Sequence, residues 1–205
     1  MTKNENISVK DIKNPARPLK KAGKKESVPR WYIAECKPTK ERTVRTMLKN
    51  AGYNVYVAAQ SEEHIYKSRN RRTVEKIVIP GKLFVCVEEE KLMDIMQTFS
   101  SVYRFQKERA GLENQYGSKP FAFVPDNQME QLQFILNKAE KPVFFTAENF
   151  KLNQKVKVVS GPFEGMEGWF YRTAASSYIV IRVEMGENNL VYTEIPVEDV
   201  RPIDE

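Results

Sequence analysis

Near its C-terminal end the chain reads KVKVVSGPFEGMEGWFYR, from Lys155 to Arg172. Its valines, set among lysines, are typical of a β-strand, because β-branched side chains pack well on a pleated sheet. The strand pattern breaks at a glycine and a proline, and a second strand is expected to leave at Trp169. Three glycines give the turn backbone freedom, and Met166 and a phenylalanine are expected to fold back beneath it. The turn residues are Gly161, Pro162, Phe163, Gly165 and Gly168.

This stretch resembles a KOW motif, in which a strand, a loop and a strand open a small barrel in proteins that service transcription or the ribosome. An ordinary glycine-rich hairpin is the alternative. Two more strands are expected at residues 177–185 and 190–196, around a turn-forming tip. Roughly five strands suffice for an SH3-like β-barrel, whose closure removes free strand edges. We therefore expect residues 151–205 to form a KOW domain.

Composition indicates a globular protein rather than a membrane protein or an enzyme. Of the 205 residues, 41% are hydrophobic, which is enough to form a core. No stretch is long and apolar enough to span a bilayer, and the N-terminus has no apolar export segment, so we expect a cytoplasmic, monomeric protein without membrane contacts. Cys36, Cys86 and the single histidine form no spacing typical of a metal site or a catalytic nucleophile, so we expect no enzymatic activity, metal or cofactor.

The net charge of +6 is distributed unevenly. Residues 1–29 carry eight bases against three acids and show little apolar periodicity, which predicts a disordered basic leader. Such a leader either contacts nucleic acid or is simply solvated. Residues 151–205 carry six bases against nine acids, and phosphate binding depends on Lys and Arg. We therefore expect the KOW domain to bind a protein.

Residues 30–139 alternate between strand and helix patterns. RWYIAEC, from Arg30, reads as a strand, and a helical pattern capped by Thr39 follows it. The stretch VEKIVIPGKLFVCV, from Val74, reads as a central strand after a Pro-Gly turn, and two helices follow, the second capped by Asn127 and Glu130. This order predicts an α+β domain with a mixed sheet and packed helices, joined to the KOW domain by a linker at residues 140–150.

A polar excursion at residues 61–73 contains KSRNRR, six residues without an acid. Such a hairpin tip could grip phosphates or exposed bases, and a solvated loop is the alternative. Its bases are Lys67, Arg69, Arg71 and Arg72.

The strand beginning WY, the helix, the basic hairpin, IPGKLFV and VYRF together resemble the N-terminal domain of the NusG family, whose hallmark is PGY(L/V)(F/V)V. With the KOW motif, the resemblance covers nearly everything after Pro29. Tyr32, Cys36 and Lys37 form a Y-x-x-x-C-K start, and RNRRT, ending at Thr73, is similar to the basic hairpin of specialised paralogues. Those paralogues include RfaH and the Bacteroidete antiterminators of capsular polysaccharide operons.

The resemblance implies a transcription elongation regulator that docks on the clamp of the largest subunit of RNA polymerase. It would suppress pausing and termination on specific long operons, such as those for surface polysaccharides. The positions matching the docking surface are Lys82, Phe84, Val102 and Phe105, although Lys82 replaces the family's usual aromatic residue and Phe84 could equally be core. The positions matching contacts with exposed DNA in the elongation complex are Lys37, Lys40, Arg42, Arg69, Arg71 and Arg72. The KOW partner would be the ribosome or a termination factor.

The alternative is an RNA- or ribosome-binding KOW module protein that makes no polymerase contact. The acidic KOW segment and the complete N-terminal pattern both count against this alternative.

Overall fold

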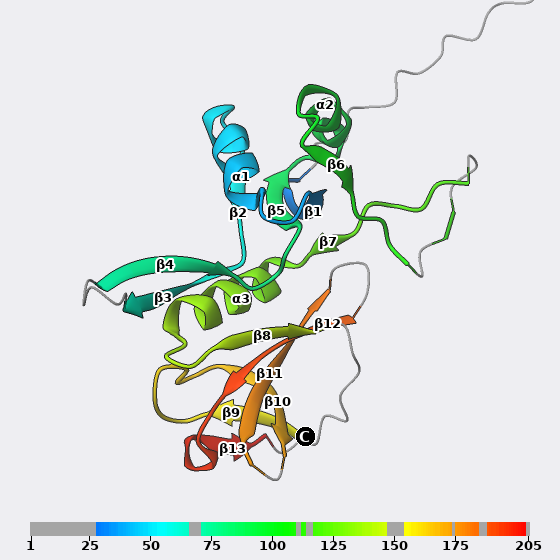
Figure 1. The fold of residues 1–205 in the computed structure, drawn as a ribbon. Helices are drawn as coiled ribbons and strands as arrows, with labels where there is room; N and C mark the ends of the chain where they lie inside the picture. Colours follow the sequence, from blue (N-terminus) through cyan, green and yellow to red (C-terminus); the bar gives the residue numbers. More distant parts are fainter. Residues whose placement is uncertain are drawn as a thin grey trace, which may run out of the picture.

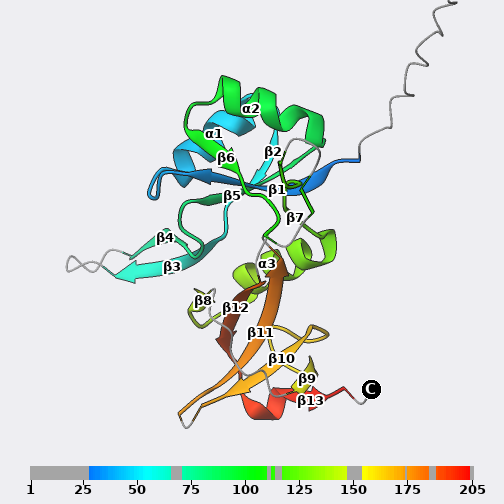
Figure 2. The same cartoon turned by 90° about the vertical axis from the view of Figure 1, so that its right-hand side faces the viewer.

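Helices and sheets alternate in layers in this computed structural model, which describes residues 28–65, 71–109, 112–113, 117–146, 154–173, 175–184 and 188–203. Helices α1 (Glu41–Asn50) and α2 (Leu92–Thr98) cover one face of a first sheet, and α3 (Asp126–Lys138) lies on its other side (Figure 1). A second sheet lies beyond α3, so this helix separates the two sheets in both views (Figure 2). None of the described helices has the length and apolar character needed to span a bilayer.

The first sheet is antiparallel in every described pairing. Its order is β2 (Asn54–Tyr56), β5 (Lys82–Val87), β1 (Arg30–Cys36) and β6 (Val102–Phe105), and β7 (Phe123–Val124) also pairs with β1. β5 and β6 run in the same direction, but β1 lies between them. The predicted α+β class is therefore confirmed, whereas the expected mixed sheet is corrected to an antiparallel one.

The two faces of β1 belong to different cores, because successive side chains of a strand point to opposite faces. Tyr32, Ala34 and Cys36 pack with the buried residues of α1 and α2. Ile33 packs with Phe84 and with the buried side chains of α3, which are Met129, Leu132, Ile135 and Leu136. The sheet is thus covered by helices on both faces, whereas the apolar LFVCV run predicted cover on at least one side.

The starts of α1 and α3 differ from the predicted caps. Lys40 is the N-cap of α1 and Pro125 that of α3, and neither makes a side-chain cap hydrogen bond. The predictions for Thr39 and for Asn127 with Glu130 are therefore wrong. Instead, the buried Glu41 accepts a hydrogen bond from the backbone N–H of Gly81 at 2.7 Å. This bond ties the start of α1 to the Pro-Gly turn before β5. A short 3₁₀ turn, η1 (Glu89–Lys91), leads into α2.

The second sheet is open. Its order is β13 (Val200–Pro202), β9 (Gln154–Val158), β10 (Glu167–Arg172), β11 (Ser177–Glu184), β12 (Asn188–Glu194) and β8 (Val143–Thr146), and η2 (Val197–Asp199) precedes β13. No pairing in the described chain joins β13 to β8, so the expected barrel closure is not found. β8 falls within the predicted linker and extends the sheet by pairing with β12. The predicted linker therefore contributes a strand of this sheet.

The predicted turn between β9 and β10 has the expected glycine geometry. Gly161 and Gly165 adopt φ values of 81° and 86°, a region in which side chains with a Cβ are strained. Phe163 and Met166 are buried beneath the turn, as predicted. The Phe163 ring also meets that of Phe134 on α3, with centroids 6.5 Å apart and the planes at 63°. One continuous core therefore joins α3 to the second sheet.

Candidate functional site

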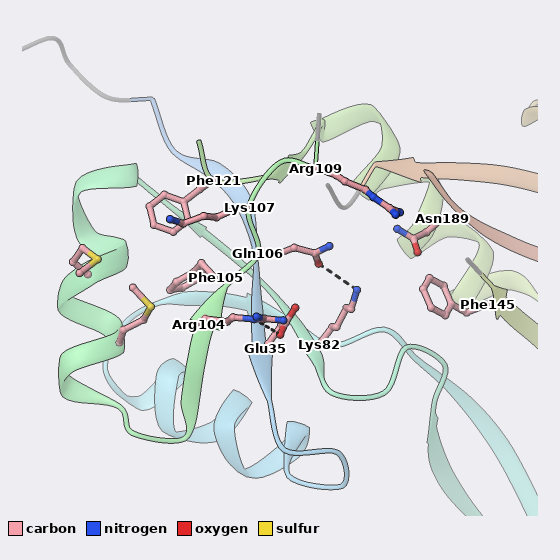
Figure 3. Close-up of a pocket in the computed structure, with 12 residues that line it drawn as sticks. Glu35, Lys82, Arg104, Phe105, Gln106, Lys107, Arg109, Phe121, Phe145 and Asn189 are labelled. Atoms are coloured by element: carbon pink, nitrogen blue, oxygen red, sulfur yellow. Dashed lines mark hydrogen bonds and ion pairs between the residues drawn. The ribbon is translucent and has the colours of Figure 1, made fainter. Parts of the chain in front are cut away.

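A cavity of about 730 Å³ opens where β5, β6 and α2 face the second sheet. Its apolar lining comes from α2, β6, the segment before β7, and β8, and its polar lining is mostly basic (Figure 3). We call it the interface cavity. Its lining residues are Glu35, Lys82, Met93, Met96, Arg104, Phe105, Gln106, Lys107, Arg109, Phe121, Phe145 and Asn189.

A β-bulge lies next to two lining residues of the interface cavity, Glu35 and Arg104. β1 pairs Glu35 with Arg104 but Cys36 with Val102, so Tyr103 is the extra residue on β6. Because a bulge turns an additional side chain off the regular alternation, both Tyr103 and Arg104 point outward. Tyr103 is 61% exposed.

The bases of the cavity are held by specific partners. Arg104 donates to the Glu35 carboxylate at 2.7 Å, and this bond raises the pKa of Arg104. The Lys82 ammonium donates to the Gln106 side-chain oxygen at 3.2 Å, on the side of the cavity that faces Phe145 (Figure 3). Four bases, Lys82, Arg104, Lys107 and Arg109, against one carboxylate make the cavity electropositive.

The four residues expected to meet a polymerase are split by the structure. Lys82 and Phe105 line the interface cavity, although only 2% of Phe105 is exposed. Phe84 and Val102 are buried in the two cores of the first sheet and do not line the cavity. Neither side chain offers accessible surface for a direct contact, because Phe84 lies in the core beneath the inner strand β5 and Val102 packs in the core with α1 and α2.

The sequence pattern does not single out Met93 and Tyr103 as exposed apolar residues. Met93 is 52% exposed on α2 beside the cavity, next to the buried Leu92 and close to the buried Ile95, so the apolar pattern of the helix alone does not show that it faces outward. VYRF predicts a strand that includes Tyr103, but apolar and polar residues do not alternate in it. That irregularity is the one sequence signal for the exposure of Tyr103.

The residues expected to contact nucleic acid lie around α1 and a two-stranded hairpin of β3 (Ala59–Ile65) and β4 (Arg71–Ile77). Lys37 and Lys40 are exposed in the turn between β1 and α1. Arg42 is engaged by β4, where its Nε donates to Glu75 at 3.3 Å. The residues outside the described part are Lys67 and Arg69, together with the side chains of Arg71 and Arg72 and the basic leader at residues 1–27.

The side chains offer no metal centre in the part of the chain that the structure describes. No group of three or more His, Cys, Asp or Glu residues is placed to hold an ion there. Burial raises the pKa of the Cys36 thiol to about 11, which disfavours the thiolate needed for a nucleophile.

Comparison with known proteins shows which family the chain resembles. The family described as transcription termination factor NusG matches residues 29–133, about half of the chain. A solved structure from Thermotoga maritima, described as domain interaction in NusG, has a TM-score of 0.44 and 17% identity, covering 86% of this chain and 98% of that one. No curated protein matches. On the strength of the family match over β1 through most of α3, the chain belongs to the NusG family.

Proposed function

We propose that this protein is a transcription elongation regulator that binds RNA polymerase and suppresses pausing and termination on specific long operons. The observation that carries the proposal is the exposed, mixed apolar and basic surface around the interface cavity, most of whose lining residues belong to the half of the chain that matches the family. Its exposed apolar side chains are Met93, which lines the cavity, and Tyr103, which precedes the lining residue Arg104 on β6. Such a surface suits a helical partner with apolar and acidic side chains, as the clamp of the largest polymerase subunit would supply.

The roles of the four predicted residues follow from their burial. We propose that Lys82 meets the partner and that Phe105 forms the floor beneath it. Phe84 and Val102 support the surface by fixing β5 and β6, which carry Lys82 and Tyr103. Replacing a fully buried phenylalanine by a polar residue would test folding rather than binding, so the exposed residues are the better test.

Other partners extend the same proposal. Lys37 and Lys40 would contact exposed DNA together with the hairpin bases, whereas Arg42 would orient the hairpin through Glu75. The second sheet would be the KOW domain, beginning at β8, with the ribosome or a termination factor as its partner. We propose that the protein acts as a monomer.

Exchanging two exposed apolar residues for acids tests the polymerase surface. The double variant Met93→Glu, Tyr103→Glu should bind the cognate RNA polymerase at least about tenfold more weakly, because acids there lose apolar contact and repel an acidic partner. Met47→Glu is the matched control, since Met47 is 40% exposed on α1, away from the cavity. Affinity is measured by biolayer interferometry on immobilised polymerase. Equal binding by the double variant and the control would refute the surface.

Transcription on two templates tests the specialised role. Purified protein should increase read-through of pause and terminator sites only where the template carries the promoter-proximal leader of its operon. Read-through on any template would indicate a general NusG role. Absence of any effect, together with failure to co-elute with polymerase, would favour the RNA- or ribosome-binding alternative.

A further inference from the structure

The outer face of the second sheet carries a row of aromatic side chains. Inward residues such as Val156, Ile179 and Val191 belong to the core shared with α3, so their strand neighbours point to the opposite face. The strand registers place Trp169 opposite Val180, Val180 opposite Tyr192, and Tyr192 opposite Phe144. We call this surface the aromatic face. Its rings are Phe144, Trp169, Tyr171, Tyr178 and Tyr192.

The rings contact one another across four adjacent strands. The Phe144 and Tyr192 rings stack with centroids 5.3 Å apart and the planes at 25°. Tyr178 meets Tyr192 edge-on at 5.6 Å, and Tyr171 meets Tyr178 at 6.2 Å. Phe144, at the β8 end, is 45% exposed. Cross-strand aromatic pairs stabilise a sheet, but that role does not require a large ring to remain this exposed at the end of the row.

Basic side chains accompany the rings. The Arg182 guanidinium lies 4.9 Å from the centroid of the Trp169 ring, and its buried Nε has no hydrogen-bond partner among the described residues. β9 adds Lys155, directly opposite Trp169, and Lys157. The segment is acidic in total, but among the described side chains of this face the acids are Glu167, which pairs with Lys155 at 3.3 Å, and Glu194, which accepts from Ser176. Three described bases therefore face two described acids, one of which is already paired.

We infer that the aromatic face binds single-stranded RNA, with bases stacked on the rings and phosphates near Lys155, Lys157 and Arg182. A row of rings with a basic rim suits single strands, because every base has a π-face that a duplex keeps hidden. The choice of RNA over DNA rests on the proposed function, since a transcribing polymerase releases single-stranded RNA. The stacking surface does not depend on that function.

Tryptophan fluorescence can report on this face alone. The chain has two tryptophans, so Trp31→Phe leaves Trp169 as the only one. A 12-residue oligouridylate should quench Trp169 in the full-length protein, and a duplex RNA of equal length should not. Phe144→Leu or Tyr192→Leu in this background should weaken binding about fivefold to 100-fold, as expected for the loss of one stacked base. Tyr53→Leu, between α1 and β2 and outside both the aromatic face and the interface cavity, is the matched control and should bind like its parent.

The outcomes separate this inference from its competitors. Binding through the basic leader would raise the anisotropy of a labelled oligonucleotide without quenching Trp169 and without dependence on Phe144. That result, or an absence of quenching, would overturn the inference. Equal affinity for an oligodeoxyuridylate would overturn the choice of RNA. No polymerase is present in the assay, so its result does not depend on whether the polymerase surface is correct.

Discussion

The glycines of the β9–β10 turn meet different constraints, although the sequence shows them as one group. A Cβ on Gly165 would meet no atom within 4 Å, and its constraint is the φ of 86°. A Cβ on Gly168 would lie 2.8 Å from the carbonyl oxygen of Val180 and 3.0 Å from the Ile179 side chain. Gly168 is therefore required by the close approach of β11, since a backbone carbonyl cannot move aside.

Two substitutions separate these constraints. Gly168→Ala should lower the free energy of unfolding by about 1–3 kcal/mol, the usual cost of overpacking. Gly165→Asn should cost less, because asparagine tolerates a left-handed backbone better than most residues and the space around it is open. Urea unfolding of both variants measures the difference. A larger loss for Gly165→Asn would show that backbone conformation, rather than space, dominates this turn.

Two ionisable side chains of the first sheet, the buried Cys36 and the half-buried Tyr56, are expected to lower the stability of the protein in alkali. Burial raises the pKa of Tyr56 from 10.0 to about 12 and that of Cys36 from 9.0 to about 11. Between about pH 9 and 12 the unfolded chain therefore binds fewer protons than the folded one, so stability falls as the pH rises. Tyr56→Phe should flatten this fall above pH 10, as measured by urea unfolding at pH 8, 10 and 11. Parallel curves for the variant and the parent would contradict the assignment to Tyr56.

At the scale of elements, the β3–β4 hairpin is anchored to α1 through one carboxylate. Glu75 on β4 accepts from Arg42 at 3.3 Å and from Arg45 at 3.1 Å, and Arg42 also donates to its carbonyl oxygen. Hydrogen bonding from Arg45, with a smaller contribution from Arg42, lowers the pKa of Glu75. These ion pairs are exposed, so their effect on global stability is expected to stay below about 1 kcal/mol. We expect these contacts to act mainly by holding the hairpin against α1.

Removing this charge should loosen the hairpin rather than unfold the protein. In Glu75→Gln, backbone amides of β3 and β4 should exchange with deuterium faster, while those of β1 and β5 stay protected. The control is Glu62→Gln, which removes only the 2.9 Å pair with Lys76 inside the hairpin. Faster exchange to the same extent in both variants would argue against anchoring by α1.

Elements whose signal is local could be predicted, and those that depend on a distant partner could not. The glycine turn, β1 and the strand containing Phe84 follow from patterns within a few residues. The bulge at Tyr103 depends on how β6 pairs with β1, which the VYRF sequence does not contain. β8 is a strand because β12 offers it a free edge, and the residues of the interface cavity meet only after both sheets are placed.

At the scale of the molecule, one amide joins the β3–β4 hairpin to the segment that leads into the second sheet. Gln60, at the start of the hairpin and 4% exposed, donates to the carbonyl oxygens of Ala139 and Lys141 at 3.0 and 2.9 Å. Its own oxygen accepts from the backbone N–H of Val143 at 3.0 Å. Three backbone groups between α3 and β8 thus depend on a side chain of the first half. This bonding fixes the path of the chain from α3 into the second sheet.

Gln60→Leu should therefore destabilise the connection between α3 and β8, although leucine and glutamine are similar in size. It leaves buried backbone groups without partners, which costs about 1–3 kcal/mol for each group that water does not reach. Gln97→Leu makes the same exchange at an exposed position on α2 and serves as the control. Limited trypsin digestion should cut Gln60→Leu faster after Lys138, at the end of α3 beside the junction, while the control resembles the parent. Unchanged cleavage after Lys138 would mean that the shared core around α3 fixes this junction without the Gln60 amide.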